Sequence, residues 1–504
     1  MLSKVISYVL NGLDGVKIEV EVDVGRGLPS FDIVGLPDTA VKESKERVHS
    51  AIKNSGKRSP TRKTLVNLAP ADVKKEGTSL DLPIAVGVLV SDEQLISTEL
   101  GDTVFFGELS LDGSVRRVTG LLPMLISAVN DGFKKFVIPK DNEAEASYIE
   151  GIEVYPAVNL TEVTNHLSGY KRIEKVKTRS FSEVLKKVTY SADLKYVKGQ
   201  SVAKRALEIA VSGGHNVLFV GPPGTGKTML AKCIPTIMPD MTLEEALAVT
   251  KIHSVAGLID ESEGIVTARP FRSPHHTSTT VAMTGGGKSV KPGEISLAHN
   301  GVLFLDEMPE YMRSTLESLR QPLEDGVITI SRANSTATYP ADFILCGSMN
   351  PCPCGNFGSH DKVCTCTPAQ IEKYKSKISG PLLDRIDLQV DVDSVKYEEL
   401  VHKEEGESSA EVRKRVNRTR AIQRERFNGD GIFTNSQMTE AEINKYCELS
   451  ESCENILKSA YKSLHFSARA RSRILKVART IADMDLSDDI KEKHLLEAIS
   501  YRHK

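Results

Sequence analysis

The residues best suited to chemistry form a glycine-rich stretch that follows the apolar run Val217–Val220 and reads Gly221-Pro222-Pro223-Gly224-Thr225-Gly226-Lys227-Thr228. An apolar strand, a G-x-x-x-x-G-K-[ST] loop and a helical pattern succeed one another, which is the order of a phosphate-binding loop. The glycines let backbone N–H groups approach phosphate oxygens, and the helix N-terminus adds a positive dipole end. Lys227 is suited to the β- and γ-phosphates and Thr228 to Mg²⁺. The stretch predicts a site for ATP and magnesium; a chance match in a loop is the alternative.

A second motif lies downstream, where the apolar run Val302–Leu305 leads into Asp306 and Glu307. A buried strand that ends here would deliver Asp306 to Mg²⁺ and Glu307 to the water that attacks the γ-phosphate. The alternative is a core strand that merely ends in acidic residues. Its position after a phosphate-binding loop favours the catalytic interpretation, so the chain is predicted to hydrolyse the nucleotide.

Four of the eight cysteines lie close together, as Cys352-Pro353-Cys354 and Cys364-Thr365-Cys366. Four thiolates in two close pairs can surround one tetrahedral Zn²⁺, although the usual spacing is C-x₂-C rather than C-x-C. Two disulfides, which a reducing cytosol disfavours, and simply packed thiols are the alternatives. We predict a structural zinc ion.

Composition describes an ordinary soluble globular protein, with 40% hydrophobic and 26% charged residues in a chain long enough for about three domains. The net charge of −2 gives no global field that would attract nucleic acid, so any such contact must come from local patches. The sequence shows neither a membrane-spanning apolar run nor a secretory signal, and a cytoplasmic location is expected. We divide the chain into residues 1–167, a basic linker at 168–192, residues 193–395 and residues 396–504.

The elements of the first region alternate between strand and helix patterns. Ile18–Val24 alternates apolar and polar residues, and Phe31–Val34 resumes the pattern after Gly25, Gly27 and Pro29, which predicts a hairpin. Thr39–Asn54 has a helical period, and further helix and strand patterns follow. This order predicts an α+β domain.

Three stretches of this region resemble the magnesium-chelatase-like ComM/YifB family of AAA+ ATPases: GLPSFDIVGLPDTAVKESKERVHSAI, TLVNLAPADVKKEGTSLDLPIAVGVL and GELSLDGSVRRVTGLLPMLISA. The resemblance implies a Lon-protease-like N-terminal domain, an α/β P-loop core with a parallel sheet and an all-α C-terminal lid. Lon proteases use a Ser–Lys dyad. Ser79 lies near the position of that serine, but Leu122 stands where the lysine would be, so we expect no peptidase activity.

The family resemblance also assigns roles in the central region. Residues 254–291 resemble the helix-two insertion of this clade, and His275 and His276 within them are expected at the surface because adjacent strand residues point to opposite faces. A helix is predicted over Leu316–Gly326, followed by a β-hairpin over Val327–Tyr339 that resembles the pre-sensor hairpin. Such hairpins face a ring's central pore, and Arg332 is a candidate DNA contact; a plain structural hairpin is the alternative.

Two more residues complete the resemblance to an AAA+ site. Asn350, at the end of the apolar run from Phe343, fits the sensor that orients the attacking water. Arg385, in SGPLLDRID, resembles the arginine finger that reaches the γ-phosphate of the neighbouring subunit, which implies a ring, expected to be a homo-hexamer.

The C-terminal region carries the densest positive charge, in a predicted helix that runs from Val412 to Arg426 and includes Arg413, Lys414 and Arg415. A solvated helix face and a DNA-binding patch are both open interpretations. Further on, Arg469 resembles the second sensor, which contacts nucleotide from the lid, and Arg473 shares its helix face as the second choice.

The resemblance favours an ATP-driven hexameric DNA motor, a helicase or branch-migration factor in recombination and natural transformation. A chelatase-type motor that remodels a protein partner is the second hypothesis, and an ATP-dependent protease is disfavoured by Leu122. Stimulation of ATP hydrolysis by single-stranded or branched DNA separates the first two hypotheses.

Overall fold

The computed structural model describes residues 2–96, 99–185, 190–287, 290–332, 335–358, 362–395, 406–464 and 468–502. Its contacts divide the chain into two compact units. The first contains Met1–Lys187, Thr242–Thr267 and Ser331–Thr338, and the second contains Val188–Met241, Ala268–Ile330 and Tyr339–Lys504. Within the described ranges, no helix is long and apolar enough to cross a membrane.

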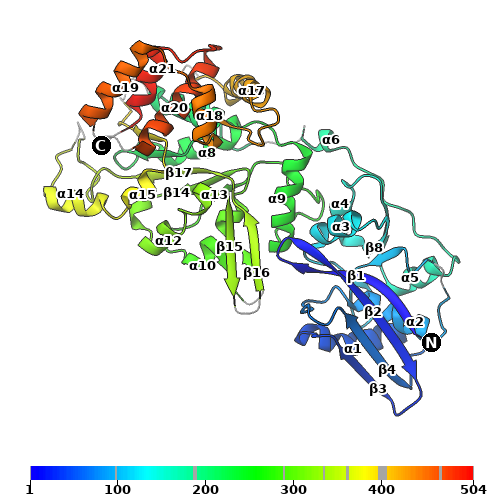
Figure 1. Ribbon diagram of the computed structural model, residues 1–504. Helices are drawn as coiled ribbons and strands as arrows, with labels where there is room; N and C mark the ends of the chain where they lie inside the picture. The colour runs from blue at the N-terminus through cyan, green and yellow to red at the C-terminus, as the bar shows by residue number, and fades with distance from the viewer. Residues whose placement is uncertain are drawn as a thin grey trace. The chain divides into compact units, whose positions relative to one another are not determined.

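The first unit is built on a seven-stranded mixed sheet in the order β3-β4-β2-β1-β5-β8-β9 (Figure 1). Its strands are β1 (Ser3–Asn11), β2 (Asp14–Gly25), β3 (Ser30–Val34), β4 (Lys63–Ala69), β5 (Thr103–Phe105), β8 (Lys135–Pro139) and β9 (Glu153–Ala157). The predicted hairpin between residues 18–24 and 31–34 is wrong. Strand β2 instead pairs with β1 through a tight turn at Gly12, where φ is +65°, and β3 lies parallel to β4.

Helices of the first unit have the expected amphipathic or fully apolar character. Helix α1 (Thr39–Asn54) has the predicted bounds, begins at the N-cap Asp38 and buries Val41 and Val48. Helix α2 (Asp81–Ser91) is buried along nearly its whole length. The remaining short elements are β6 (Glu108–Leu109), β7 (Val115–Arg116), α3 (Leu121–Asn130), η1 (Lys140–Asn142), α4 (Glu143–Ala146), α5 (Leu160–Leu167) and α6 (Phe181–Leu185).

Helix α9 (Leu243–Ala256) belongs to the first unit, although the sequence division placed it in the central region. It begins with a capping box formed by Thr242 and Glu245. The carboxylate of Glu145, 3% exposed, accepts from Arg117 Nη2 at 2.9 Å and from Ser254 Oγ at 3.0 Å. A buried polar network therefore fixes α9 to the helices of this unit.

The second unit contains a five-stranded sheet in the order β11-β14-β17-β10-β18, in which all neighbours are parallel. The strands are β10 (Val217–Val220), β11 (Phe271–Arg272), β14 (Val302–Leu305), β17 (Ile344–Met349) and β18 (Leu388–Asp391). Helices α7 (Ser201–Gly213) and α8 (Lys227–Ile237) pack their apolar residues into the same core. The predicted parallel α/β sheet is confirmed, and the loops after β10, β14 and β17 meet at one edge.

After α9, β11 joins the central sheet beside β14, a pairing that the sequence analysis did not predict. The segment after α9 also contains α10 (Thr280–Thr284), β12 (Gly285–Gly286), β13 (Lys291–Pro292) and α11 (Glu294–Leu297). The single helix predicted over residues 316–326 is wrong. Two short helices, α12 (Arg313–Glu317) and α13 (Pro322–Asp325), replace it because Pro322 has no N–H and starts a new helix.

The predicted hairpin is present as β15 (Val327–Arg332) and β16 (Ser335–Pro340), which form a two-stranded sheet (Figure 1). Its turn, Ala333-Asn334, and the side chain of Arg332 lie outside the described residues. The short 3-10 segments of the second unit are η2 (Leu194–Tyr196), η3 (Met308–Glu310) and η4 (Asn435–Gln437).

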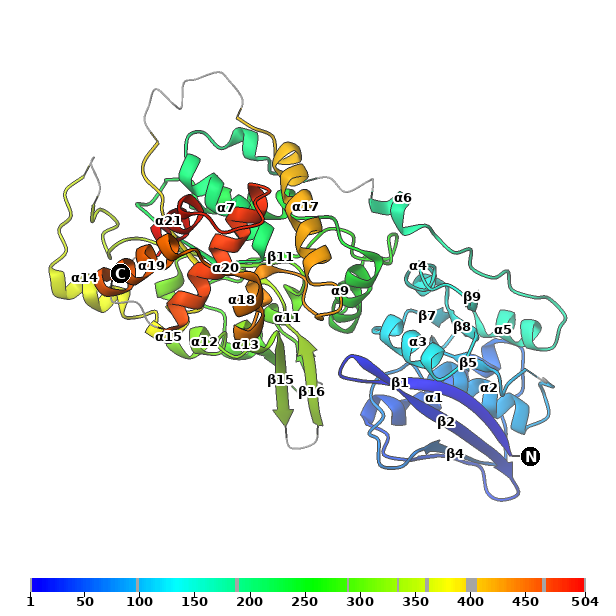
Figure 2. The same cartoon turned by 45° about the horizontal axis from the view of Figure 1, so that its top comes forward.

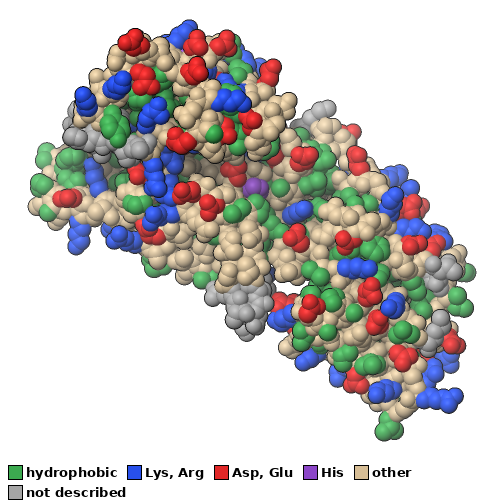
Figure 3. Space-filling model, viewed as in Figure 1, with side chains coloured by type: hydrophobic (Ala, Val, Ile, Leu, Met, Phe, Trp, Pro, Cys, Tyr) green, Lys and Arg blue, Asp and Glu red, His purple; other side chains and the backbone are tan. Residues whose placement is uncertain are grey.

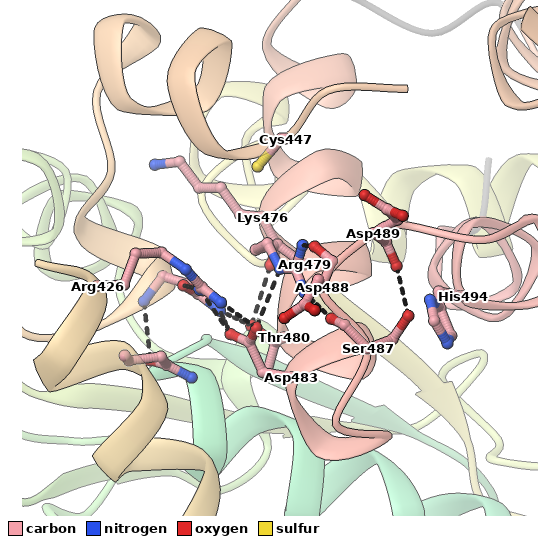
Figure 4. Close-up of polar contacts among 12 residues, drawn as sticks. Arg426, Cys447, Lys476, Arg479, Thr480, Asp483, Ser487, Asp488, Asp489 and His494 are labelled. Atoms are coloured by element: carbon pink, nitrogen blue, oxygen red, sulfur yellow. Dashed lines mark hydrogen bonds and ion pairs between the residues drawn. The ribbon is translucent and has the colours of Figure 1, made fainter. Parts of the chain in front are cut away.

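Helices make up the C-terminal part of the second unit, and α17 packs against α7, α8 and α20 (Figure 2). They are α14 (Pro368–Lys375), α15 (Gly380–Leu383), α17 (Ser409–Arg426), α18 (Glu440–Tyr446), α19 (Glu451–Leu464), α20 (Ala468–Met484) and α21 (Glu492–Ser500). Figure 4 shows Arg426 and Arg479 converging on the fully buried carboxylate of Asp483. This network fixes α20, whose first turns carry Arg469 and Arg473.

Candidate active site

The phosphate-binding loop lies where the sequence placed it, between buried β10 and the start of α8. Gly224 and Gly226 have φ of +82° and +88°, a conformation that L side chains rarely adopt. Gly221 is confined for a different reason, because a Cβ there would lie 2.2 Å from the carbonyl oxygen of Val392. The glycine positions are therefore dictated by backbone geometry and close packing.

The Lys227 ammonium lies inside the curve of this loop. Its Nζ donates to the carbonyl oxygens of Gly221 at 2.7 Å and Pro222 at 2.8 Å, and to Oδ1 of Asn350 at 3.4 Å. Burial lowers the pKa of Lys227, and the nearby carboxylates of Asp306 and Glu307 partly oppose this shift. A bound phosphate would replace the carbonyl contacts with stronger charge-assisted hydrogen bonds.

Asp306 and Thr228 form the candidate magnesium site. Thr228 Oγ1 donates to Asp306 Oδ2 at 2.9 Å, and Ser348 Oγ donates to Oδ1 of the same carboxylate. The carboxylate is thus oriented from α8 on one side and from β17 on the other. Hydroxyl and carboxylate oxygens are suitable ligands for Mg²⁺, which binds few protein groups and completes its shell with water and phosphate.

Glu307 has an unusual backbone conformation for a residue with a side chain, with φ of +51°. Its N–H donates to Asp306 Oδ1 at 3.1 Å and to Ser348 Oγ at 3.2 Å, which holds the turn after β14. The side chain is more than half exposed, at 58%. This arrangement leaves the carboxylate accessible to a water molecule beside the γ-phosphate.

His276 is a member of this site that the sequence analysis missed. Its Nδ1 lies 4.0 Å from Glu307 Oε2, and its ring contacts Tyr311 edge-on at 6.4 Å between centroids. The expectation that His275 and His276 point to opposite faces is wrong, because they follow β11 in a loop and their rings lie 4.1 Å apart. Pairing of β11 with β14 brings this loop beside Glu307.

Arg385 does not project into solvent. Its side chain is 9% exposed, forms an ion pair with Glu324 and donates from Nη1 to the carbonyl of Pro381 at 2.8 Å. Among the described residues, none accepts a hydrogen bond from its buried Nε. The guanidinium lines a cavity of about 180 Å³ together with Glu324, Asp384, Glu440, Arg469, Ser472, Arg473 and Lys476.

The two lid arginines differ in this cavity. Arg473 is held by the buried carboxylate of Asp387 and donates from Nη1 to the carbonyl of Arg385 at 3.3 Å, so it positions the Arg385 backbone. Arg469, the first choice from sequence, is exposed and lines the same cavity. Figure 3 shows Lys and Arg side chains gathered between the C-terminal helices and α15.

The four cysteines lie together, with all Sγ atoms within 4.8 Å of one another. Cys352 Sγ is 3.4 Å from that of Cys354 and 3.7 Å from that of Cys364, and the last two are 3.6 Å apart. Tetrahedral zinc with Zn–S bonds of about 2.3 Å requires S–S separations of about 3.8 Å. Backbone N–H groups of Asn356 and Thr365 lower the pKa of Cys354 to about 6, which favours a thiolate there. At Cys364 the Cys366 N–H also lowers the pKa, but burial and the neighbouring thiols outweigh it and raise the pKa. The set fits a zinc ion.

Two of the basic residues proposed to bind DNA are engaged within the chain. Arg413 donates from Nη2 to the carbonyl of Thr236 at 2.7 Å and pairs with Asp240 at 3.2 Å. Arg415 pairs with Glu208 at 2.6 Å and also with Glu407. These arginines attach α17 to its neighbours, and their binding to DNA stays a prediction; Lys414, between them, is exposed.

The first unit places the residues of the proposed degenerate dyad in buried surroundings. Ser79 is 7% exposed, and Leu122 is fully buried in α3. Lys75, which the sequence analysis passed over, is also fully buried, and its ammonium donates to the carbonyl of Pro70.

Comparisons with known proteins agree with this architecture. The family described as "Magnesium chelatase, subunit ChlI" matches residues 193–400, "Subunit ChlI of Mg-chelatase" matches residues 20–142, and "Magnesium chelatase, subunit ChlI C-terminal" matches residues 406–502. "Uncharacterized protein YifB" of Escherichia coli is 44% identical over 97% of this chain and 95% of its own length. "Competence protein ComM" of Haemophilus influenzae is 42% identical over 99% of this chain and 97% of its own length. A magnesium-chelatase 67 kDa subunit of Chlorobaculum parvum is 27% identical over 31% of this chain and 23% of its own length.

Proposed function

This chain belongs to the magnesium-chelatase-like ComM/YifB family of AAA+ ATPases, and we propose that it is an ATP-hydrolysing ring motor that acts on DNA during recombination. The convergence of Lys227, Asp306, Glu307 and Asn350 at one edge of the parallel sheet carries the ATPase part of the proposal. In this proposal, the motor works in the cytoplasm.

At the nucleotide site, the loop N–H groups from Gly221 to Thr228 and the Lys227 ammonium bind the phosphates. Thr228 and Asp306 would hold Mg²⁺, which would supply positive charge to neutralise the phosphates. Glu307 accepts a proton from the attacking water, and Asn350, within 3.4 Å of Lys227 Nζ, orients that water against the γ-phosphate.

The place of Arg385 supports the proposal of a ring. Its cavity is lined by residues of α13, α18 and α20 and of the turn after α15, and the lining residues include none from the Gly221–Thr228 loop. We propose that this surface meets the nucleotide of the neighbouring subunit, with Arg385 released from Glu324 and Arg469 beside it. Six copies closed into a hexamer would contain six such shared sites. An arginine supplied from a partner raises the rate on the order of 10³-fold or more.

This arrangement gives a mixing test. Lys227→Ala removes a subunit's own nucleotide site but leaves its Arg385, whereas Arg385→Ala does the reverse. Each variant alone is expected to be inactive, and Arg385→Ala is expected to bind ATP still. Rings assembled from both variants are expected to regain part of the ATPase activity. Absence of any recovery, with mixed rings verified by mass photometry, would contradict a shared site.

DNA as the substrate rests on similarity. The relative named a competence protein covers nearly the full length of both chains, whereas the chelatase subunit aligns with under a third of this one. The β15–β16 hairpin with Arg332 at its tip and the exposed Lys414 are the proposed DNA contacts. A motor that remodels a protein partner remains the alternative function, and the N-terminal unit is proposed to be a non-proteolytic Lon-like domain.

The four-cysteine centre, defined as Cys352, Cys354, Cys364 and Cys366, is proposed to hold one structural zinc ion. Its Sγ separations of 3.4, 3.6 and 3.7 Å support this proposal. Metal analysis of the purified protein is expected to give one zinc per chain.

The DNA proposal is tested by strand exchange on a labelled four-way junction with ATP and magnesium. Wild-type protein is expected to separate the junction arms, and ATP hydrolysis is expected to rise with branched or single-stranded DNA. Glu307→Gln, which keeps the fold and nucleotide binding, is the hydrolysis-deficient control. ATP hydrolysis without stimulation by DNA, together with no gel shift at low salt, would favour the protein-remodelling alternative.

A further inference from the structure

The four-cysteine centre lies next to the active site in sequence and in space. Cys352 follows Asn350 by two residues, and the segment that starts at Cys352 leads through α14 to Arg385. The centre therefore lies in the chain between the residue proposed to orient the attacking water and the arginine proposed to serve the neighbouring site.

One contact joins the centre directly to the phosphate-binding loop. Gly355 lies directly after Cys354, and its φ is +78°. A Cβ added to Gly355 would lie 2.7 Å from Cδ of Pro223, so the backbone of the cysteine segment packs closely on the loop. The N–H of Gly355 donates to the carbonyl of buried Cys352 at 3.0 Å, which closes this turn.

A second path runs through α14. Thr367, the residue after Cys366, forms a capping box with Gln370 and so begins this helix. At the other end of α14, the Tyr374 side chain is buried and its hydroxyl lies beside the backbone of Asn350.

The same segment then reaches the acidic motif. Lys377 Nζ lies 3.1 Å from Oε1 of Glu310, and Glu310 N–H donates to the carbonyl of Glu307 at 2.7 Å. The cysteine segment and α14 therefore contact the phosphate-binding loop, Asn350 and the turn that carries Glu307.

We propose that metal binding by the four-cysteine centre controls ATP hydrolysis, by fixing Pro223, Asn350 and the Glu307 turn relative to one another. This inference rests on the proposed ATPase function. Without a metal ion, Cys352–Cys354 and Cys364–Cys366 are not crosslinked, so the start of α14 and the Gly355 turn lose their common anchor. Phosphate binding needs mainly the loop and Lys227, whereas hydrolysis also needs the water-orienting groups. Metal loss is therefore expected to lower kcat much more than nucleotide affinity.

The test compares full-length wild type, Cys364→Ser and Gly355→Ala, with Cys453→Ser as the control for a buried thiol outside the centre. Zinc is measured by mass spectrometry, affinity with a fluorescent ATP analogue, and hydrolysis at saturating magnesium. Cys364→Ser is expected to lose zinc and to lower kcat about 10- to 100-fold, with affinity nearly unchanged. Gly355→Ala keeps all four thiols and is expected to retain zinc yet also lower kcat. Cys453→Ser is expected to match wild type in both.

Removal of zinc by 1,10-phenanthroline, which leaves magnesium in solution, is expected to lower kcat by a similar factor. Addition of zinc is expected to restore it. Hydrogen exchange of residues 221–228 and 346–352 is measured in parallel and is expected to rise without zinc. Unchanged kcat and unchanged exchange after verified zinc loss would overturn the inference, as would wild type that binds no metal. Zinc-loaded wild type that does not hydrolyse ATP would refute the proposed ATPase instead, and the exchange data would still decide whether the centre fixes the loop.

Discussion

Asp387 connects the lid to the proposed arginine finger, and its replacement by Asn makes a sharp test of that connection. The Asp387 side chain is 2% exposed and pairs with Arg473, while its Oδ2 accepts from the N–H of Asn216 at 3.2 Å. Arg473 Nη1 and Asn216 Nδ2 also donate to the carbonyl of Arg385, at 3.3 and 2.9 Å. Loss of the Asp387 charge therefore leaves Arg473 without its buried counter-ion.

The magnitude follows from this burial. Removing one partner of a buried, hydrogen-bonded ion pair costs about 3–5 kcal/mol, because the remaining charge is left uncompensated. At roughly 2–4 °C per kcal/mol for a structural unit of a few hundred residues, the melting temperature of the second unit is expected to fall by about 6–20 °C. Because the Arg385 carbonyl loses the support of Arg473, ATPase activity at a permissive temperature is expected to fall as well.

Differential scanning calorimetry of Asp387→Asn measures this effect. The control is Asp489→Asn, on the exposed surface of the same helical region, and its free energy of unfolding is expected to lie within about 0.5 kcal/mol of wild type. Arg473→Met is then combined with Asp387→Asn. If the pair interacts as described, the double variant is less destabilised than the sum of the single variants. A loss below about 1 kcal/mol for Asp387→Asn, or strict additivity, would refute the reasoning.

Three further predictions follow from the same structure. Burial alone would raise the pKa of Asp387, but Arg473 and His215 hold this pKa well below its ordinary value. The Asp387 carboxylate therefore stabilises the fold fully above about pH 4, and this stabilisation is lost as the pH falls further. Acid unfolding of Asp387→Asn is accordingly expected to depend less steeply on pH than that of wild type. His276→Ala is expected to lower kcat about 10- to 100-fold by misplacing Glu307 without changing ATP affinity, whereas His275→Ala is expected to have little effect; equal losses in both would contradict the role of the 4.0 Å contact. Glu145→Ala is expected to destabilise the attachment of α9 by about 2 kcal/mol and to accelerate hydrogen exchange selectively in residues 243–267. Unchanged hydrogen exchange in these residues would show that the Arg117–Glu145–Ser254 network does not hold the helix.

The parts of the site that the sequence predicts are those in which neighbouring residues carry the chemistry. The strand–loop–helix order around Lys227 and the acidic end of β14 are each complete within about ten residues, so local pattern determines them. Helix α1 was predicted for the same reason, since a periodic apolar face is a local feature.

The features that the sequence analysis missed depend on pairing between distant segments. His276 reaches Glu307 only because β11 pairs with β14, in the register Phe271 with Val302. A two-residue strand gives almost no periodic signal, so the sequence did not predict this pairing. Likewise, Arg413 and Arg415 gave a basic pattern along the chain, but their carboxylate partners, Asp240 and Glu208, come from segments more than 150 residues away in the sequence.

The chain after β17 connects two groups of residues that we propose to act in ATP hydrolysis. Asn350 follows β17 and lies beside the chain's own phosphate-binding loop, whereas Arg385 lies in the cavity that it shares with Arg469. If Arg385 serves a neighbouring subunit, as we propose, the segment between these residues joins two nucleotide sites through a single chain. A flexible segment would transmit little of one site's state to the next, because small displacements are passed on by packed, rigid elements rather than by loops. A metal centre that fixes this segment against Pro223 would supply that rigidity where the two sites are joined.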